Sequence, residues 1–81
     1  MTEERRKELA KSVSQLAEKT RVGIRNVREE IVKEIQRREK DGDISEDEKI
    51  SAKEDLQKIV DKYNEEVKKL AEAKEKEIMT I

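Results

Sequence analysis

Three arginines in the first half of the chain are the side chains best placed to do chemistry. Arg21, Arg25 and Arg28 follow one another at steps of four and three residues, within the segment RVGIRNVR. On a helix, this spacing places all three on one side. Each guanidinium group carries a permanent charge and a planar set of donors that matches two phosphate oxygens. The row is therefore a candidate binding surface for a phosphate backbone.

The helical sector around this row contains no acid between Lys7 and Val32 when successive residues are placed about 100° apart. Only Arg25 has an acid four residues away, Glu29. No aromatic residue accompanies the row, so we expect contact with an RNA backbone or with folded RNA, not with stacked bases. The alternative is a solvated face crossed by salt bridges, which charged helices commonly form. The sector comprises Lys7, Ala10, Ser14, Arg21, Arg25, Arg28 and Val32.

Other kinds of site have little support in the sequence. Cysteine and histidine are absent, which removes disulfides, thiol chemistry and the usual zinc ligands. The segment DGDISEDE lacks the ligand spacing of an EF-hand calcium loop. A catalytic pair of acids needs a pocket that shifts their pKa, and a thin helical rod offers none. We therefore expect no enzyme activity, no cofactor and no metal site.

The composition favours long helices. Of the 81 residues, 51% are charged and 32% are hydrophobic, with one aromatic residue and no proline. This excludes an ordinary globular core with layered sheets. High charge also fits disorder in isolation, but the apolar residues recur at helical spacing. No apolar run is long enough for a signal peptide or a membrane span, so we expect a cytoplasmic protein.

Two apolar stripes of helical period predict an all-α antiparallel hairpin roughly 50 Å long. One helix is expected over about residues 3–39 after an N-cap at Thr2, and another over about 46–79 after a capping box of Ser45 and Glu48. Gly42 suits a left-handed cap in the turn at about 40–45. The elevenfold repeat predicts nearly straight helices with weak coiled-coil twist. The stripes are Leu9, Val13, Leu16, Thr20, Ile24, Val27, Ile31 and Ile35, then Ala52, Leu56, Ile59, Tyr63, Val67, Leu70, Lys74 and Ile78.

Each stripe is wider than a single partner helix would cover. Gly23 lies near the first stripe and would permit the close approach of another backbone. A further helix should therefore pack on the hairpin, supplied by another segment to form a three-helix bundle or by a second copy of the chain. The residues that widen the stripes, and that we expect to face this extra helix, are Ala10, Ala17, Val32, Val60 and Ala71.

Four separated motifs carry a family resemblance: TEERRKEL at 2–9, VGIRNVR at 22–28, DGDISEDE at 41–48 and KEKEIM at 74–79. In this order and spacing they resemble the carboxy-terminal part of domain I of bacterial ribosome recycling factor. The resemblance covers essentially the whole chain after Met1. It implies an L-shaped architecture, in which domain I is a three-helix bundle and domain II is inserted between the first helix and the other two.

The resemblance also implies function. Domain I contacts 23S ribosomal RNA of the large ribosomal subunit, domain II faces elongation factor G, and together the two factors split post-termination ribosomes. The family's functional arginines lie in its TEERR and RNxR motifs, which match Arg6, Arg25 and Arg28 here. Arg21 stands at a position that is often basic. The expected RNA-binding residues are therefore Arg6, Lys7, Arg21, Arg25 and Arg28.

This chain also departs from the family pattern. We expect it to correspond to the last two helices of domain I, with the family's first helix and domain II outside the sequence. Since recycling requires domain II, we do not expect these residues to perform it alone. Glu29 stands where many members carry another basic residue, which weakens the expected RNA contact there. The alternatives are a structural module that self-associates through its apolar stripe, and an unrelated coiled-coil adaptor.

Overall fold

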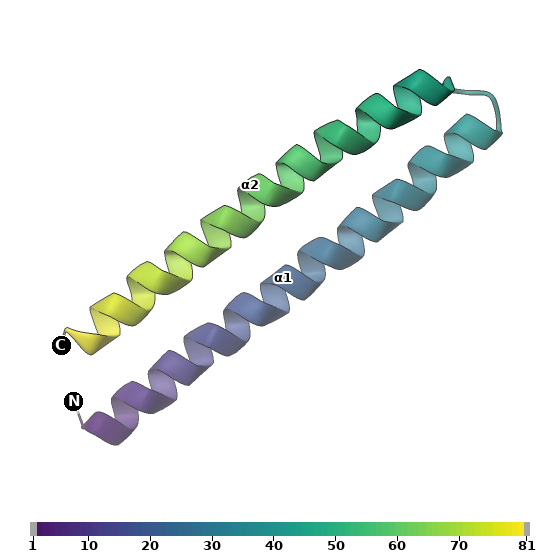
Figure 1. The fold of residues 1–81 in the computed structure, drawn as a ribbon. Helices are drawn as coiled ribbons and strands as arrows, with labels where there is room; N and C mark the ends of the chain where they lie inside the picture. The colour runs from purple at the N-terminus through teal and green to yellow at the C-terminus, as the bar shows by residue number, and fades with distance from the viewer. Residues whose placement is uncertain (1, 81) are drawn as a thin grey trace.

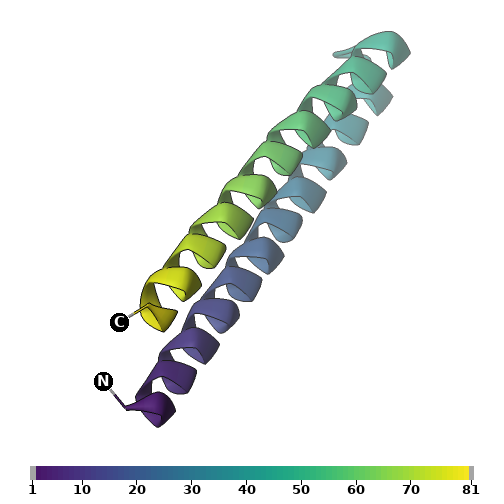
Figure 2. The same ribbon diagram turned by 60° about the vertical axis from the view of Figure 1, so that its left-hand side comes forward.

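Two long helices and a short turn account for the fold in a computed structural model, which describes residues 2–80. Helix α1 spans Glu3–Lys40 and helix α2 spans Glu46–Met79. They lie side by side and antiparallel, with both ends of the chain at one end of the rod (Figure 1). Figure 2 shows the same pairing after a turn of 60°. The rod measures 60 × 15 × 9 Å. The predicted all-α hairpin is confirmed, and its assignment to a larger bundle stays a prediction.

Local hydrogen bonds define the helix ends, as the sequence predicts. The Thr2 hydroxyl accepts a hydrogen bond from the backbone N–H three residues later, at 3.1 Å. Gly42 adopts a φ of 82°, and the N–H groups of Gly42 and Asp43 donate to carbonyls in the last turn of α1. This is a Schellman turn. Ser45 and Glu48 form the expected capping box at the start of α2. The starts of both helices and the end of α1 are therefore fixed by hydrogen bonds between residues a few positions apart in the sequence.

The contact between the helices runs along one edge of each apolar stripe, including Leu56 and Ile78, and leaves the opposite edge open. We expected Ala17 and Val60 to face an additional helix, but both are buried where α1 and α2 meet. That expectation was wrong because the apolar arc is wide enough for the two helices to meet at either edge. A small side chain such as Ala17 lets the two backbones approach closely. The buried apolar residues in the described chain are Ala17, Leu56, Val60 and Ile78.

The opposite edges of the stripes remain exposed along the rod. Leu16, Tyr63 and Leu70 are exposed to 65%, 51% and 71% of their full area. Gly23 lines the same hollow as Tyr63, and a methyl group added to it would meet no atom within 4 Å. The close backbone approach expected there is thus not made by any residue from 2 to 80. Despite this apolar surface, neither helix is long and apolar enough to cross a membrane over the described residues.

Candidate nucleic-acid interface

Two grooves run along the hairpin, and the arginine row borders one of them. At about 100° per residue, Arg21 and Arg25 lie on one side of the helix contact, while Leu16 and Val27 lie on the other. The groove beside the arginine row, which we call the polar groove, contains a depression of about 390 Å³. Its lining comprises Arg21, Arg25, Arg28 and Glu29 from α1 with Gln57, Val60 and Asn64 from α2. This groove is the candidate RNA interface.

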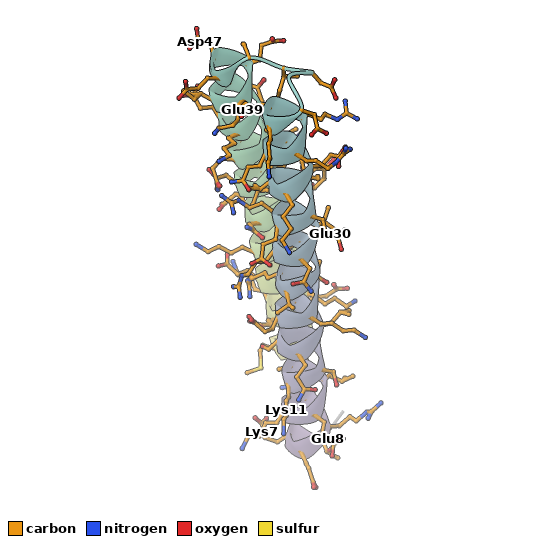
Figure 3. All side chains as sticks on the ribbon, turned by 90° about the vertical axis from the view of Figure 1, so that its right-hand side faces the viewer. Lys7, Glu8, Lys11, Glu30, Glu39 and Asp47 are labelled. Atoms are coloured by element: carbon orange, nitrogen blue, oxygen red, sulfur yellow. The ribbon has the colours of Figure 1, made fainter. Side chains whose placement is uncertain are left out.

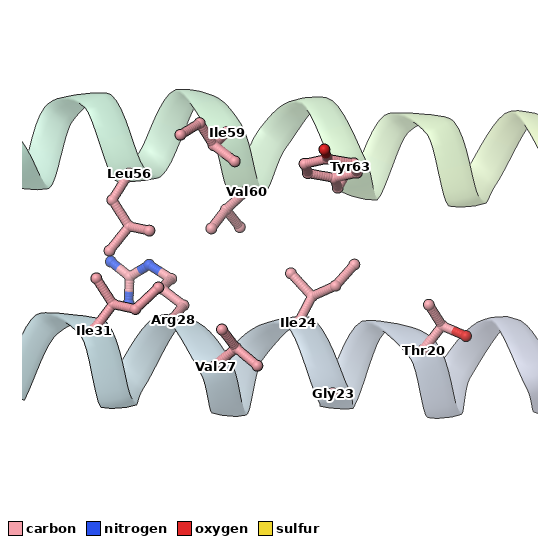
Figure 4. Close-up of a pocket in the computed structure, with 10 residues that line it drawn as sticks. All are labelled: Thr20, Gly23, Ile24, Val27, Arg28, Ile31, Leu56, Ile59, Val60 and Tyr63. Atoms are coloured by element: carbon pink, nitrogen blue, oxygen red, sulfur yellow. The ribbon is translucent and has the colours of Figure 1, made fainter.

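The other groove is lined almost entirely by carbon. It holds a hollow of about 530 Å³ near the middle of the rod (Figure 4) and another of about 280 Å³ toward the chain ends. We call this surface the apolar groove. Its exposed side chains from the stripes are Leu16, Val27, Ile31, Ile59, Tyr63 and Leu70.

Arg28 is anchored across the contact between the helices. Its Nε donates a hydrogen bond to Oε1 of Gln57 at 3.0 Å. The amide of Gln57 then donates from Nε2 to Oδ1 of Asp61 at 2.8 Å. The guanidinium group reaches from α1 toward α2 beside Leu56 (Figure 4). Its two terminal nitrogens make no hydrogen bond or ion pair with residues 2–80. They remain able to donate to an external anion.

Arg21 and Arg25 differ in whether a carboxylate neutralises them. Nη1 of Arg21 lies 3.6 Å from Oε2 of Glu18. The expectation of a row without acid partners was wrong for Arg21, because Glu18 reaches it from a spacing of three, which also places side chains together on a helix. Arg25 is exposed, and it forms no ion pair with Glu29 or with another acid of the described chain. The open positive charge therefore belongs to Arg25 and Arg28.

Arg6 and Lys7 lie apart from the row. At a rise of about 1.5 Å per residue, Arg6 is about 33 Å from Arg28 along α1. Arg6 is half-buried, and its Nε is buried with no hydrogen-bond partner among residues 2–80. Lys7 is exposed near the end of the rod opposite Glu39 and Asp47 (Figure 3). The structure therefore does not bring these two residues into one site with Arg28.

The residues of α2 in the polar groove were missed by sequence reasoning. Gln57 and Asn64 are seven residues apart, so the sequence already places them on one face of a helix. Which polar face of α2 lies beside Arg28 depends, however, on how the two helices are rotated and aligned. That relation has no signal within α1 or α2 alone.

Acids enter the polar groove toward the chain ends. Oγ of Ser14 donates a hydrogen bond to Oε1 of Glu75 across the helices at 2.9 Å, and Glu72 also lines this part. The cationic part of the groove is therefore the half that contains Arg25 and Arg28.

No group of three or more acidic side chains in residues 2–80 is arranged to hold a metal ion.

Arginines near the turn are neutralised by a shared carboxylate. Arg37 and Arg38 both donate hydrogen bonds to Glu34. These bonds stabilise the charged carboxylate, so they lower the pKa of Glu34, with Arg37 as the larger cause. The same hydrogen bond, donated by Arg37 to Glu34, raises the pKa of Arg37. This pair provides an internal contrast with the open charges of Arg25 and Arg28.

The fold is thus a helical rod that presents open positive charge in one groove and exposed apolar side chains in another. The family model described as ribosome recycling factor matches residues 1–79. The ribosome-recycling factor of Caldicellulosiruptor saccharolyticus is 51% identical over 81 residues, covering 100% of this chain and 44% of the relative. That of Erythrobacter litoralis is 52% identical over 80 residues, covering 99% and 43%.

The ribosome-recycling factor of Synechococcus sp. is 48% identical over 81 residues, again covering 100% of this chain and 44% of the relative. The chain therefore belongs to the ribosome recycling factor family, a family of translation factors. It spans less than half the length of these relatives.

Proposed function

We propose that these residues are a ribosome-binding part of a recycling factor in the cytoplasm, and that the polar groove contacts 23S ribosomal RNA of the large subunit. Family membership supports a role at the ribosome. The RNA contact is supported chiefly by Arg25 and Arg28, whose charges are not neutralised by any carboxylate of residues 2–80. Guanidinium groups bind phosphate oxygens in paired, charge-assisted hydrogen bonds. An RNA backbone is therefore the ligand that this pair fits.

The remaining candidate residues have secondary roles in this proposal. Arg21 contributes when a phosphate replaces Glu18, whose contact with it is long and exposed to solvent. Arg6 and Lys7 meet a separate stretch of RNA near the chain ends, because about 33 Å separates Arg6 from Arg28. One extended RNA surface thus contacts two places on the rod.

Purified large ribosomal subunits test this proposal. The double variant Arg25→Ala with Arg28→Ala should bind more weakly at low salt. Its plot of log affinity against log salt should flatten by about 0.9 for each phosphate that the variant no longer neutralises. The matched control is Arg37→Ala with Arg38→Ala, which removes the same charge from arginines already bonded to Glu34. Equal affinity of wild type and the groove variant at both low and high salt would reject the RNA contact.

A role for elongation factor G is proposed only for full-length members of the family. The resemblance implies that it faces domain II, so we expect no direct contact with these 81 residues. Ribosome splitting is accordingly proposed for full-length members. The chain alone should compete with such a member for the large subunit without splitting ribosomes, which a subunit-dissociation assay at increasing chain concentration would measure.

A second role is supported by the apolar groove. Leu16 and Leu70 are exposed to 65% and 71%, and the groove extends past both hollows. Burying apolar surface contributes about 25 cal/mol per Å², so a partner covering this length would be favoured by several kcal/mol. For the chain alone we propose that a second copy occupies the groove and forms a four-helix bundle. Arg28 lines both the polar depression and the apolar hollow, while Arg21 and Arg25 line only the polar side and would stay open to RNA in such a dimer.

Sedimentation at several concentrations tests this pairing. Leu70→Asp places a charge in the apolar groove and should give monomers where wild type forms dimers. Val22→Asp is the matched control, since Val22 is also exposed, at 39%, but lies outside both hollows of the apolar groove. A wild-type chain that stays folded and monomeric at all concentrations would reject self-association without affecting the RNA proposal.

A further inference from the structure

The polar groove contains amide groups that a simple row of arginines would not need. Gln57 uses both ends of its amide, accepting from Arg28 at 3.0 Å and donating to Asp61 at 2.8 Å. Its amide is therefore already engaged on both sides within the hairpin. The hydrogen bond from Arg28 to Gln57 fixes the position of Nε. The edge of the guanidinium group formed by Nη1 and Nη2 stays free to bind a ligand.

Asn64 lies in the same depression with an unused amide. Its Oδ1 is buried and accepts no hydrogen bond from residues 2–80. Its Nδ2 also donates none within this part of the chain. A polar group in this situation is normally satisfied by a partner. The buried Oδ1 is an acceptor and needs a donor, so it does not itself point to an anion. Nδ2 is the end of the amide that is able to donate to an anion in the depression.

The arginines converge on this depression instead of forming an open line. Arg21, Arg25 and Arg28 all contribute to its lining, and about 10 Å of helix separates the first from the last. Val60, which is buried, also belongs to the lining. Glu29 is the acid that lines the depression, and it makes no ion pair with residues 2–80. Glu18, outside the lining, pairs with Arg21, so Arg25 and Arg28 are the two open cations that face Glu29 at this place.

We propose that the depression is a site for one RNA phosphodiester, built by both helices. Arg28 and Arg25 donate to its oxygens, Asn64 adds a neutral donor, and Gln57 is a positioning residue that orients Arg28. Orienting a long side chain before binding reduces the entropy lost on binding. This inference rests on the proposed function, because it names the α2 residues and the ligand group of the same RNA contact.

A double-mutant cycle on Gln57 and Arg28 tests the positioning role with large ribosomal subunits as the probe. Gln57→Ala should weaken binding roughly threefold to tenfold, as expected when one hydrogen bond is removed, and should leave the salt slope unchanged. In the Arg28→Ala background the same change should have no effect, since its target is gone. Gln57→Glu should weaken binding more and flatten the slope, because a carboxylate would neutralise Arg28.

The matched control for this cycle is Gln36→Ala. Gln36 is exposed on α1 and makes no hydrogen bond to residues 2–80 through its side chain. It should bind as wild type does. If Gln57→Ala has no effect in wild type, or an equal effect in the Arg28→Ala background, the positioning role is wrong. Circular dichroism of each variant shows whether the helices are retained.

Asn64→Leu tests the added donor. It should weaken binding by a further factor of about two to five, since one neutral hydrogen bond is removed. The salt slope should stay unchanged, and the effect should persist in the Gln57→Ala background. Binding equal to that of wild type would remove Asn64 from the site.

A titration with inorganic phosphate separates the site from the proposed function. The NMR signal of the Arg28 Nε–H group should shift to saturation in the wild-type chain, but only weakly in Gln57→Glu. If the chain fails to bind ribosomal subunits yet shows this saturation, the proposed function falls and the phosphate site stands. The opposite outcome is that subunit binding requires Arg25 and Arg28, while the Arg28 signal responds equally in wild type and Gln57→Glu and the Gln57→Ala variant binds subunits normally. In that case the phosphate site is wrong and the proposed function stands.

Discussion

The two grooves of this hairpin are built by the same pair of helices but have opposite chemistry. In the polar groove, side chains from α1 and α2 are tied together, as in the hydrogen bonds from Arg28 to Gln57 and from Ser14 to Glu75. In the apolar groove, Leu16, Tyr63 and Leu70 are more than half exposed. One surface is already organised by the hairpin, while the other is left to be covered.

The two surfaces differ in whether their side chains need water or need to be removed from it. Charged groups that bind RNA must stay near water until the ligand arrives, so they can be oriented by a few hydrogen bonds at the surface. Apolar groups gain their stabilisation only when water is removed. The hairpin alone can therefore orient the arginines of the proposed RNA contact, whereas the proposed covering of the apolar groove requires a further helix.

The largest expected effect comes from placing one charge at neighbouring positions of α2. Val60→Asp would remove a buried apolar side chain and desolvate a carboxylate, with only partial compensation from the arginines of the same depression, so it should destabilise the hairpin by roughly 2–3 kcal/mol. Ile59→Asp changes a side chain that is 53% exposed and should retain most helicity at concentrations where the chain is monomeric. Thermal melts followed by circular dichroism compare them. Equal melting temperatures would show that the contact does not run along the Val60 flank.

The two glycines should respond to alanine with opposite signs. Gly42 has a φ of 82°, so Gly42→Ala should cost about 1–2 kcal/mol. Gly23 is helical and has open space beside it, so Gly23→Ala should stabilise the monomeric hairpin by up to about 1 kcal/mol. Urea unfolding at low concentration measures both. Destabilisation by Gly23→Ala under these conditions would indicate that another backbone already occupies the apolar groove.

A smaller effect is expected from releasing Arg21. Glu18→Gln removes the carboxylate 3.6 Å from Arg21 and should tighten binding to large subunits by up to about fivefold at low salt, since exposed pairs are worth about 1 kcal/mol at most. Glu30→Gln makes the same charge change at an exposed residue of α1 that forms no ion pair within residues 2–80. If both variants bind equally well, the gain reflects net charge and not Arg21.

The smallest effect concerns pH and the cluster near the turn. Hydrogen bonds from Arg37 and Arg38 lower the pKa of Glu34 in the folded chain. Its stabilising contribution is therefore complete above the unfolded pKa and is lost as pH falls through the folded value. At neutral pH the melting temperature of Glu34→Gln should lie below that of wild type, and this difference should shrink in acid. Glu30→Gln serves as the control. A difference that grows in acid would contradict the assigned direction.

Much of the fold could be predicted because its signals are local. Thr2, Gly42 and the Ser45–Glu48 capping box act on backbone groups within a few residues, and the apolar period is visible along each helix. The site was predicted less completely. Arg25 and Arg28 were found from spacing on α1, but the pairing of Arg21 with Glu18 was missed because only a spacing of four was considered.

The sequence by itself determined that two helices form, where they begin and end, and that arginines gather on one side of α1. Each of these properties depends on residues less than about two turns apart. Only the tertiary structure decided which edge of the wide apolar arc is buried, so that Ala17 and Val60 are buried while Leu70 stays exposed. It also decided that Gln57 lies beside Arg28. The physical reason is that many rotations of one helix against another bury similar apolar area, and only the packing of specific side chains selects one.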